Sequence, residues 1–231
     1  MKGRGHIVAT RDGIAALRSD APLAFRETAD GLFMVGTAAG PIGGDDVTIE
    51  IEVAAGATLT LRSAAAALAR PGRSGEPSRL RVHAAVAGTL RWLPAPSIAA
   101  RGCRHIVEVH LSVTGEGHVE WRDELILGRD DEEPGEWTGS MRADVDGTPL
   151  LRQTLAIGAD GWRGPAVLAG AKAVGGILVS GERAPAAVAG EGYAVMPLAG
   201  PGTLISAVAP DALTLAAHLD HAKRNICSLR L

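Results

Sequence analysis

Two short segments carry the side chains with the clearest potential for metal chemistry. Between residues 101 and 113, the alternation of a β-strand puts Cys103 and His105 on one face, and Glu108 and His110 on the other. Neutral imidazole suits nickel, zinc and copper, so either pair would hold such an ion transiently. A tight site normally needs three or four ligands. The alternative is that Cys103 and His105 join the apolar core, while Glu108 and His110 are solvated.

The second segment lies near the end of the chain. His218 and His221 are three residues apart on a predicted helix, with Asp220 beside them, so the two imidazoles would share one surface. The pattern brings no third ligand to that face, so a solvated polar face is the alternative interpretation. The acidic run at 130–134 lacks the alternating ligands and glycine of an EF-hand loop, and we expect a solvated turn there.

Motifs of strong catalytic meaning are absent from the sequence. It contains no GxxxxGK[ST], no GxGxxG that opens a helix after a strand, no GxSxG and no HExxH. The sequence leaves open a catalytic set whose members are dispersed along the chain, because the members of a triad follow no fixed order. A small-molecule-binding or hydrolytic β domain that uses His105, His110, Asp123 or Glu124 is therefore one functional hypothesis.

Composition excludes several other classes. Of the 231 residues, 46% are hydrophobic but only 3% are aromatic, so we expect an ordered core of aliphatic side chains. Lys and Arg number 23 against 26 Asp and Glu, without the dense positive face that a nucleic-acid partner would require. No apolar run has signal-peptide or uninterrupted membrane-spanning character, and the two cysteines form no disulfide framework. These features predict a cytoplasmic protein with no membrane partner.

The elements that position these residues are predicted to be mainly β, as stacked antiparallel sheets with one or two short helices. Within residues 47–53 every odd residue is apolar and every even one polar, which is typical of a half-buried strand. Gly56 suits a turn into a second strand at 58–62, and together they predict a hairpin. Further strands are expected at 79–86, 88–93, 105–113, 118–128, 140–145 and 150–157, with shorter ones at 165–168, 176–180 and 193–198.

A C-terminal helix is predicted after Pro210-Asp211, from an apolar stripe of Ala212, Leu213, Leu215, Ala216 and Leu219. The alanine-rich run at 64–69 is a possible second, short helix, because Ala is the best helix former. A loop is expected at 70–77, which is rich in Pro, Gly, Arg and Ser. No stretch has the composition of a long linker, so residues 1–231 are predicted to form one domain.

Several motifs also occur in a characteristic order. They are IGGDD at 42–46, GATLTL at 56–61, GTLRWLP at 88–94, VEWRDELILGR at 119–129, GEWTG at 135–139 and PLL at 149–151. This ordered set resembles the urease accessory protein D family, which is called H in some bacteria. The resemblance implies a non-enzymatic maturation factor that binds apo-urease and accessory proteins F and G, the latter a GTPase, and assists nickel insertion.

The resemblance also implies an internal polar passage along which nickel travels, with no cofactor permanently bound. Asp45 matches an acidic position of that passage and joins Cys103 and His105 as a candidate metal residue. A carboxylate binds nickel weakly enough to release it onward. The alternative is a turn aspartate that hydrogen-bonds its own backbone. Where many members of that family carry Glu, this chain has Gln153, which replaces a carboxylate with a neutral amide.

Partner-binding candidates complete the expectations. The segment at 63–70 keeps the Arg of the family, as Arg70, but lacks its Lys and Tyr. We take Arg70, Trp92, His218 and His221 as candidate contacts with partner proteins. Trp92 lies among strand-like apolar residues, so core packing is its alternative role.

Overall fold

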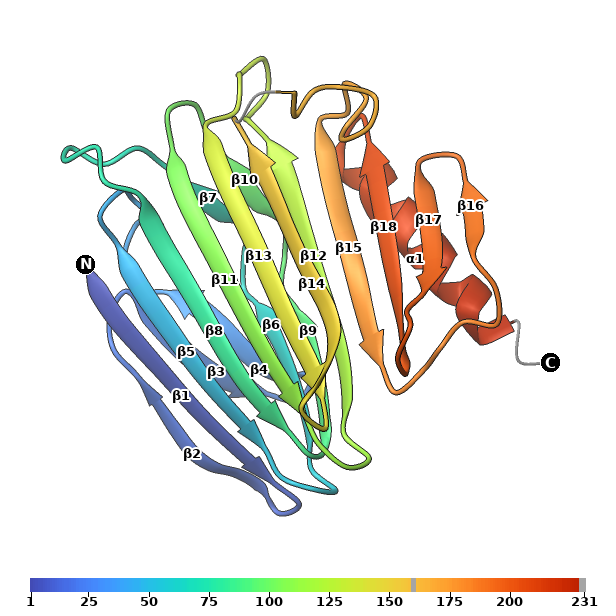
Figure 1. Cartoon of the computed structure of the whole chain (residues 1–231). Helices are drawn as coiled ribbons and strands as arrows, with labels where there is room; N and C mark the ends of the chain where they lie inside the picture. Colours follow the sequence, from blue (N-terminus) through green and yellow to red (C-terminus); the bar gives the residue numbers. More distant parts are fainter. Residues whose placement is uncertain (159–160, 229–231) are drawn as a thin grey trace.

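Two β-sheets face each other in the computed structural model, and a helix covers part of the larger one (Figure 1). The structure describes residues 1–158 and 161–228. In spatial order, the seven-stranded sheet contains β14 (Thr148–Ile157), β13 (Glu136–Val145), β11 (Arg104–Val113), β8 (Ser78–Val86), β5 (Asp46–Val53), β1 (Lys2–Thr10) and β2 (Gly13–Ser19). The eleven-stranded sheet contains β16 (Val188–Gly190), β17 (Tyr193–Pro197), β18 (Gly202–Ala209), β15 (Ala173–Ser180), β12 (His118–Leu127), β9 (Thr89–Leu93), β6 (Thr58–Ser63), β4 (Gly31–Gly36) and β3 (Leu23–Thr28), with β10 (Ser97–Ala99) and β7 (Ala67–Ala69) joined beside β12. The helix α1 spans Ala212–Ser228.

The central part of the chain coils between the two sheets. It runs through β5, β6, β8, β9, β11, β12 and β13, and each of these steps crosses to the opposite sheet. Successive coils therefore stack as parallel neighbours: β5 pairs with β8, β8 with β11, and β11 with β13, while β6 pairs with β9 and β9 with β12. Parallel strands need long connections, and here the second sheet supplies them.

The prediction of a mainly β fold with a C-terminal helix is confirmed, but the sheets are mixed rather than antiparallel. The expected hairpin of residues 47–53 and 58–62 is wrong, because β5 and β6 belong to different sheets. The turn at Gly56, with φ of +74°, leads the chain across the core. Both strands then bury their apolar side chains in the same interior, which a hairpin with the same alternation would also achieve, so the pattern alone does not distinguish them.

Aliphatic side chains form continuous rows across the parallel strands. One row joins Ile49, Val82 and Val109, which are in register and buried. Each such side chain contributes about 1.5–3 kcal/mol when it leaves water. Because a shift by one residue would turn every row to solvent, these rows fix the register of the coils and therefore of any polar residue within them.

Helix α1 lies on the outer face of the eleven-stranded sheet, against β15, β17 and β18. Asp211 caps it, since the backbone N–H of Thr214 donates to Asp211 Oδ1 at 2.8 Å. Leu215 and Leu219 are buried, whereas Leu213 of the expected apolar stripe is 85% exposed. None of the described helices is long and apolar enough to cross a membrane.

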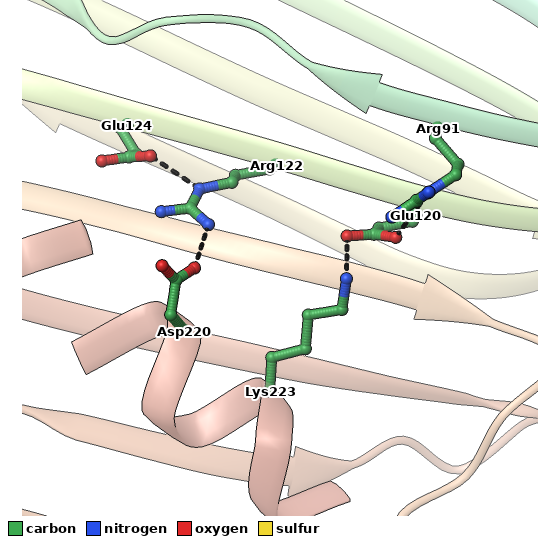
Figure 2. A network of polar contacts seen from close by, with 6 residues as sticks. All are labelled: Arg91, Glu120, Arg122, Glu124, Asp220 and Lys223. Atoms are coloured by element: carbon green, nitrogen blue, oxygen red, sulfur yellow. Dashed lines mark hydrogen bonds and ion pairs between the residues drawn. The ribbon is translucent and has the colours of Figure 1, made fainter. Parts of the chain in front are cut away.

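Charged pairs also hold the helix, as Figure 2 shows. Lys223 of α1 pairs with Glu120 of β12, which Arg91 contacts from β9 at 3.1 Å, and Asp220 pairs with Arg122 at 2.5 Å. Burial alone would raise the pKa of Glu120, but Lys223 and Arg91 outweigh it and lower the value. The outward side chains of β12 therefore fix the position of α1.

Three other local expectations differ from the structure. The run at 64–69 is not helical: its end forms β7, because pairing with β10 outweighs the helix propensity of alanine. Residues 165–168 form turns instead of a strand, with Leu168 N donating to Gly164 O at 3.1 Å. Strands β1 to β4, before residue 47, were not anticipated. The expected strand at 176–180 is confirmed within β15, and that at 193–198 is confirmed as β17 except for its last residue. Of the loop expected at 70–77, residues 71–77 are irregular, whereas Arg70 pairs with Ile42 in a β-bridge.

Candidate functional site

A cavity of about 740 Å³ lies between the two sheets. Most of its lining is aliphatic or aromatic, as expected for the interior of this fold. Asp45, His105 and Gln153 line it on the side of the seven-stranded sheet, and Trp92 and Asp123 line it from the eleven-stranded sheet. The interior therefore combines apolar walls with a few polar groups, which is the usual composition of a binding site.

A short polar row stands at the start of the parallel strands. Asp45 comes immediately before β5, Ser78 begins β8, and His105 is the second residue of β11. The carbonyl of Asp45 accepts a hydrogen bond from Arg79 N at 2.7 Å, and Ser78 lies in register with His105. All three polar residues are buried. The strand alternation that turns the aliphatic rows inward thus turns this row inward as well.

The electrostatics of the row leave His105 neutral at pH 7. Burial lowers the pKa of His105 to about 4, although the nearby Asp45 raises it. The Oγ of Ser78 and Nδ1 of His105 are 2.7 Å apart, and the imidazole packs against the Trp137 ring at 4.6 Å between centroids. A neutral imidazole beside a carboxylate is a donor set that borderline divalent cations accept.

The double glycine before Asp45 is explained by close backbone packing. A Cβ on Gly43 would lie 2.6 Å from Glu76 O and from Gly72 N, which leaves no room for a side chain. Gly44 has φ of +88°, a conformation that glycine adopts at low cost. The resulting turn brings the Asp45 Oδ2 within 2.9 Å of the Ile42 N–H, while Oδ1 pairs with the Met1 amino group. The backbone bond expected of a turn aspartate and the cavity-lining position therefore coexist.

Cys103 is buried at a different place from the cavity. It lies in the turn before β11 and packs in a cluster with Leu127, Ile157 and Leu168. Burial raises the pKa of its thiol to about 11, and its Sγ lies 3.8 Å from Glu136 O. Metals bind the thiolate, so this environment is that of a core cysteine. The described lining of the cavity includes His105 but not Cys103.

Arg70 and Trp92 both reach the cavity, in different settings. Arg70 follows β7, is half-buried and is tied to the glycine turn through Gly43 N, which donates to Arg70 O at 3.1 Å. Trp92 is 3% exposed and stacks on Trp121 with centroids 4.4 Å apart. The alternation of β9 turns Trp92 inward, so the structure favours core packing over direct contact with a partner.

His218 and His221 lie together at the outer edge of the larger sheet, as their spacing predicted. Both imidazoles face the ring of Tyr193 from β17, at centroid distances of 6.3 and 5.5 Å. His218 Nδ1 is 3.3 Å from Val208 O, whereas His221 is exposed. With Tyr193, they form a surface on the outer face of the eleven-stranded sheet, whereas the polar row belongs to the seven-stranded sheet.

The residues of the hydrolytic hypothesis do not meet. His105 and Asp123 face the interior from opposite sheets, whereas His110 is exposed on the outer face and Glu124 pairs with Arg122 at 2.6 Å. Asp123 accepts from Trp121 Nε1 at 2.5 Å, and burial raises its pKa to about 6 despite that bond. This separation removes the geometric basis for a catalytic set, and the hydrolytic hypothesis is wrong.

Two further observations complete the site. Ser78 was not anticipated; the signal was its position two residues before Leu80, which matches that of Asp45 before Val47 and His105 before Val107. Across residues 1–158 and 161–228, no three His, Cys, Asp or Glu side chains gather so that they could hold a metal ion. The interior thus offers isolated donors instead of a complete cage.

Comparison with known proteins identifies the family. The family model described as UreD urease accessory protein matches residues 2–229. A urease accessory protein UreD of Parafrankia sp. (strain EAN1pec) is 41% identical, over 90% of this chain and 81% of its own. Those of Streptomyces avermitilis and Streptomyces coelicolor are 41% and 40% identical, over 90% and 95% of this chain and 89% and 91% of theirs. The chain therefore belongs to the UreD family of urease accessory proteins and is an accessory protein, not an enzyme.

Proposed function

We propose that this chain assists the incorporation of nickel into urease by binding apo-urease together with accessory proteins F and G. Its membership of the UreD family supports a role with the urease machinery. In this proposal nickel passes through the interior cavity and is released to urease, so no metal ion stays permanently bound. The cytoplasm is the proposed location, since two cysteines that are far apart in the sequence are not the pattern of a secreted disulfide framework.

The observation that carries this proposal is the buried row of Asp45, Ser78 and His105 beside the cavity. Neighbouring rows hold Val, Leu and Ile, whose burial is favourable, whereas this row buries polar groups, each of which has a hydrogen-bond or ion-pair partner. The oxygen and nitrogen atoms of this row are of the types that a borderline divalent cation accepts. Because the donors do not form a cage, a nickel ion would be held weakly enough to move on.

Two places on the molecule are proposed for partner contact. Arg70 lines the cavity and is hydrogen-bonded to the glycine turn, where a charged group could meet the protein that supplies or receives the ion. The surface of Tyr193, His218 and His221 lies on the other side of the eleven-stranded sheet from the cavity. Aromatic side chains of this kind, with Arg, are enriched where proteins bind one another.

Coexpression tests the proposal directly. Apo-urease and accessory proteins F and G are produced with and without this chain, and the nickel content and activity of purified urease are measured. We expect nickel occupancy to fall when the chain is omitted, and the chain to copurify with the complex. Equal occupancy in both preparations would dismiss the role in nickel insertion.

A pair of surface variants tests the partner contacts. Arg70→Ala and His221→Ala are expected to weaken copurification, whereas His6→Ala, on the seven-stranded sheet, is the control. Unchanged recovery of the complex with both variants would exclude these two places as contacts.

A further inference from the structure

The last strand of the seven-stranded sheet, β14, has a free edge within the residues that the structure describes. No other strand there pairs with its second side, and no backbone hydrogen bond from a loop reaches it. Arg152, Gln153 and Thr154 are consecutive and all exposed, although Gln153 lines the cavity. Backbone N–H and C=O groups along the middle of β14 are therefore accessible to another chain.

The other sheet edges are short or covered. At the ends of the eleven-stranded sheet, β16 has three residues, and β3 contacts β2, the opposite edge of the seven-stranded sheet. Short and covered edges are common protections against pairing with another chain. The edge of β14 has neither protection, because the strand is ten residues long and its middle is open.

The larger sheet extends past β14 and presents an apolar face there. A Cβ on Gly202, the first residue of β18, would lie 3.0 Å from Leu150 Cδ2, so β14 stands over the start of β18. Figure 1 shows β17 and β16 beyond it. Ile205 packs with α1, so the alternation turns Leu204 to the opposite face, where it is in register with Met196 and both are half-buried. The inward side chains of a strand added to β14 should therefore be apolar.

The outward side chains at this edge are basic. Arg152 and Arg142 lie in register on β14 and β13, on the outer face of the sheet. Arg152 is held in place, because it pairs with Asp144 at 2.5 Å and donates to the carbonyls of Ala143 and Leu151 at 2.9 and 2.8 Å. The guanidinium group beside the free edge is thus fixed by its neighbours.

The charge of Arg142 is not compensated. No hydrogen bond or ion pair within residues 1–158 and 161–228 engages Arg142, and the nearby Asp144 and Glu108 already pair with other arginines. Arg142 and Arg152 line one surface pocket together. Guanidinium groups recognise carboxylates in paired hydrogen bonds, so the outward side chains of an added strand should be acidic.

The same charges disfavour a second copy of this chain as the occupant. A two-fold axis would pair two β14 strands in antiparallel fashion and bring the arginines of both copies together near the middle of the strands. Like charges on directly opposed strand positions are destabilising, and charged side chains at an edge are a common device against self-association. The edge therefore suits a different protein.

We propose that the free edge of β14 binds an extended segment of a partner protein in which apolar residues, facing inward, alternate with acidic residues, facing outward. Main-chain hydrogen bonds to β14 supply the affinity, whereas the apolar face and the two arginines select the alternating pattern. This surface is distinct from the contacts proposed at Arg70 and His221, and it does not depend on the passage of nickel.

Peptide binding to the full chain tests this surface without nickel, urease or other accessory proteins, so its outcome is independent of the proposed function. The probe is a fluorescent peptide as long as β14 in which valine and glutamate alternate. One control peptide has lysine in place of glutamate. A second has the same composition as the probe, but with its valines and glutamates in successive pairs, so that no strand face is wholly apolar. Fluorescence anisotropy measures affinity, and amide hydrogen exchange locates the bound peptide.

We expect the probe to bind saturably and to slow amide exchange in β14, and both control peptides to bind about tenfold more weakly or less. Arg142→Glu, which breaks no internal hydrogen bond, and Arg142→Glu/Arg152→Glu should shift the preference toward the lysine peptide. Arg18→Glu is the matched control, because Arg18 is exposed on the outer face at the opposite edge of the same sheet, in register with His6. It should keep the wild-type preference, and melting temperatures check that all variants fold.

Four results would overturn the proposal. They are the absence of saturable binding, equal affinity of the wild type for the glutamate and lysine peptides, an unchanged preference in Arg142→Glu, and protection at β2 instead of β14. A dimer of the chain alone with protected β14 amides would also contradict it, since a second copy would then occupy the edge.

Discussion

Asp123→Asn is expected to stabilise the protein in a pH-dependent way, because the wild-type carboxyl lines the cavity and loses part of its hydration there. Its pKa is raised by burial from 3.8 to about 6. At about 1.36 kcal/mol per pH unit, that difference has an upper limit of about 3 kcal/mol between the protonated and ionised forms. Because the Asp123 side chain is exposed to the space of the cavity, solvent screening reduces the expected effect to about 1 kcal/mol. Asparagine keeps a carbonyl oxygen that accepts from Trp121 Nε1 and carries no charge at any pH.

The sign follows from proton linkage. A folded-state pKa above the unfolded value means that Asp123 contributes its full stability below about pH 3.8, and loses it as the pH rises through about 6. The asparagine variant has no such loss. The free energy of unfolding of the variant minus that of the wild type is therefore expected to be about 1 kcal/mol larger at about pH 8 than in acid.

Urea unfolding at several pH values from about pH 4 to about pH 8 measures this difference. Asp12→Asn, in the exposed turn between β1 and β2, serves as the control and is expected to show no comparable trend. A constant difference between Asp123→Asn and wild type across the range would refute the reasoning, since it would mean that the carboxyl is not desolvated in the folded state.

Three further predictions concern the core, the row and the helix. Leu219→Ala should cost about 2–5 kcal/mol of unfolding free energy because Leu219 is fully buried, whereas Leu213→Ala, at an 85% exposed position on the same helix, should cost little. His105→Gln should flatten the loss of stability that the wild type suffers as pH falls from 6.5 to about 4, because the buried imidazole must take up a proton on unfolding; equal slopes in urea titrations would contradict this. Lys223→Met keeps the aliphatic stem but leaves the half-buried Glu120 without its helix partner, and should lower the unfolding free energy by about 1–3 kcal/mol. If the ion pair is the cause, the same lysine substitution should have little effect in a Glu120→Gln background.

Strand alternation predicted much of the mainly β fold, but not its connectivity. Residues 47–53 and 58–62 have the pattern of two half-buried strands whether they pair with each other or cross the core. The crossing depends on partners far away in the sequence, such as Leu80 for Val47 and Leu90 for Leu59. Strands β1 to β4 lack so regular an alternation, and their pairing with β5 and β6 decides their conformation.

The candidate site was predictable only in part, because its assembly also depends on residues that are far apart in the sequence. Residue type points to His105 and a family resemblance to Asp45, but nothing local in the sequence places the two beside each other. Their association with Ser78 follows from the register of β5, β8 and β11. Burial of Cys103 and Trp92 likewise depends on neighbours from other coils. The single domain over residues 1–231 stays a prediction.

The nickel content of urease coexpressed with an Asp45→Asn variant tests the proposed passage most directly. Asp46→Asn is the matched control, because Asp46 is the next residue in the chain but pairs with Arg81, whereas Asp45 lines the cavity. We predict that both variants copurify with the urease complex, and that only Asp45→Asn lowers the nickel bound per urease active site. Full nickel occupancy with Asp45→Asn, or an equal loss with Asp46→Asn, would contradict a passage that runs past the buried row.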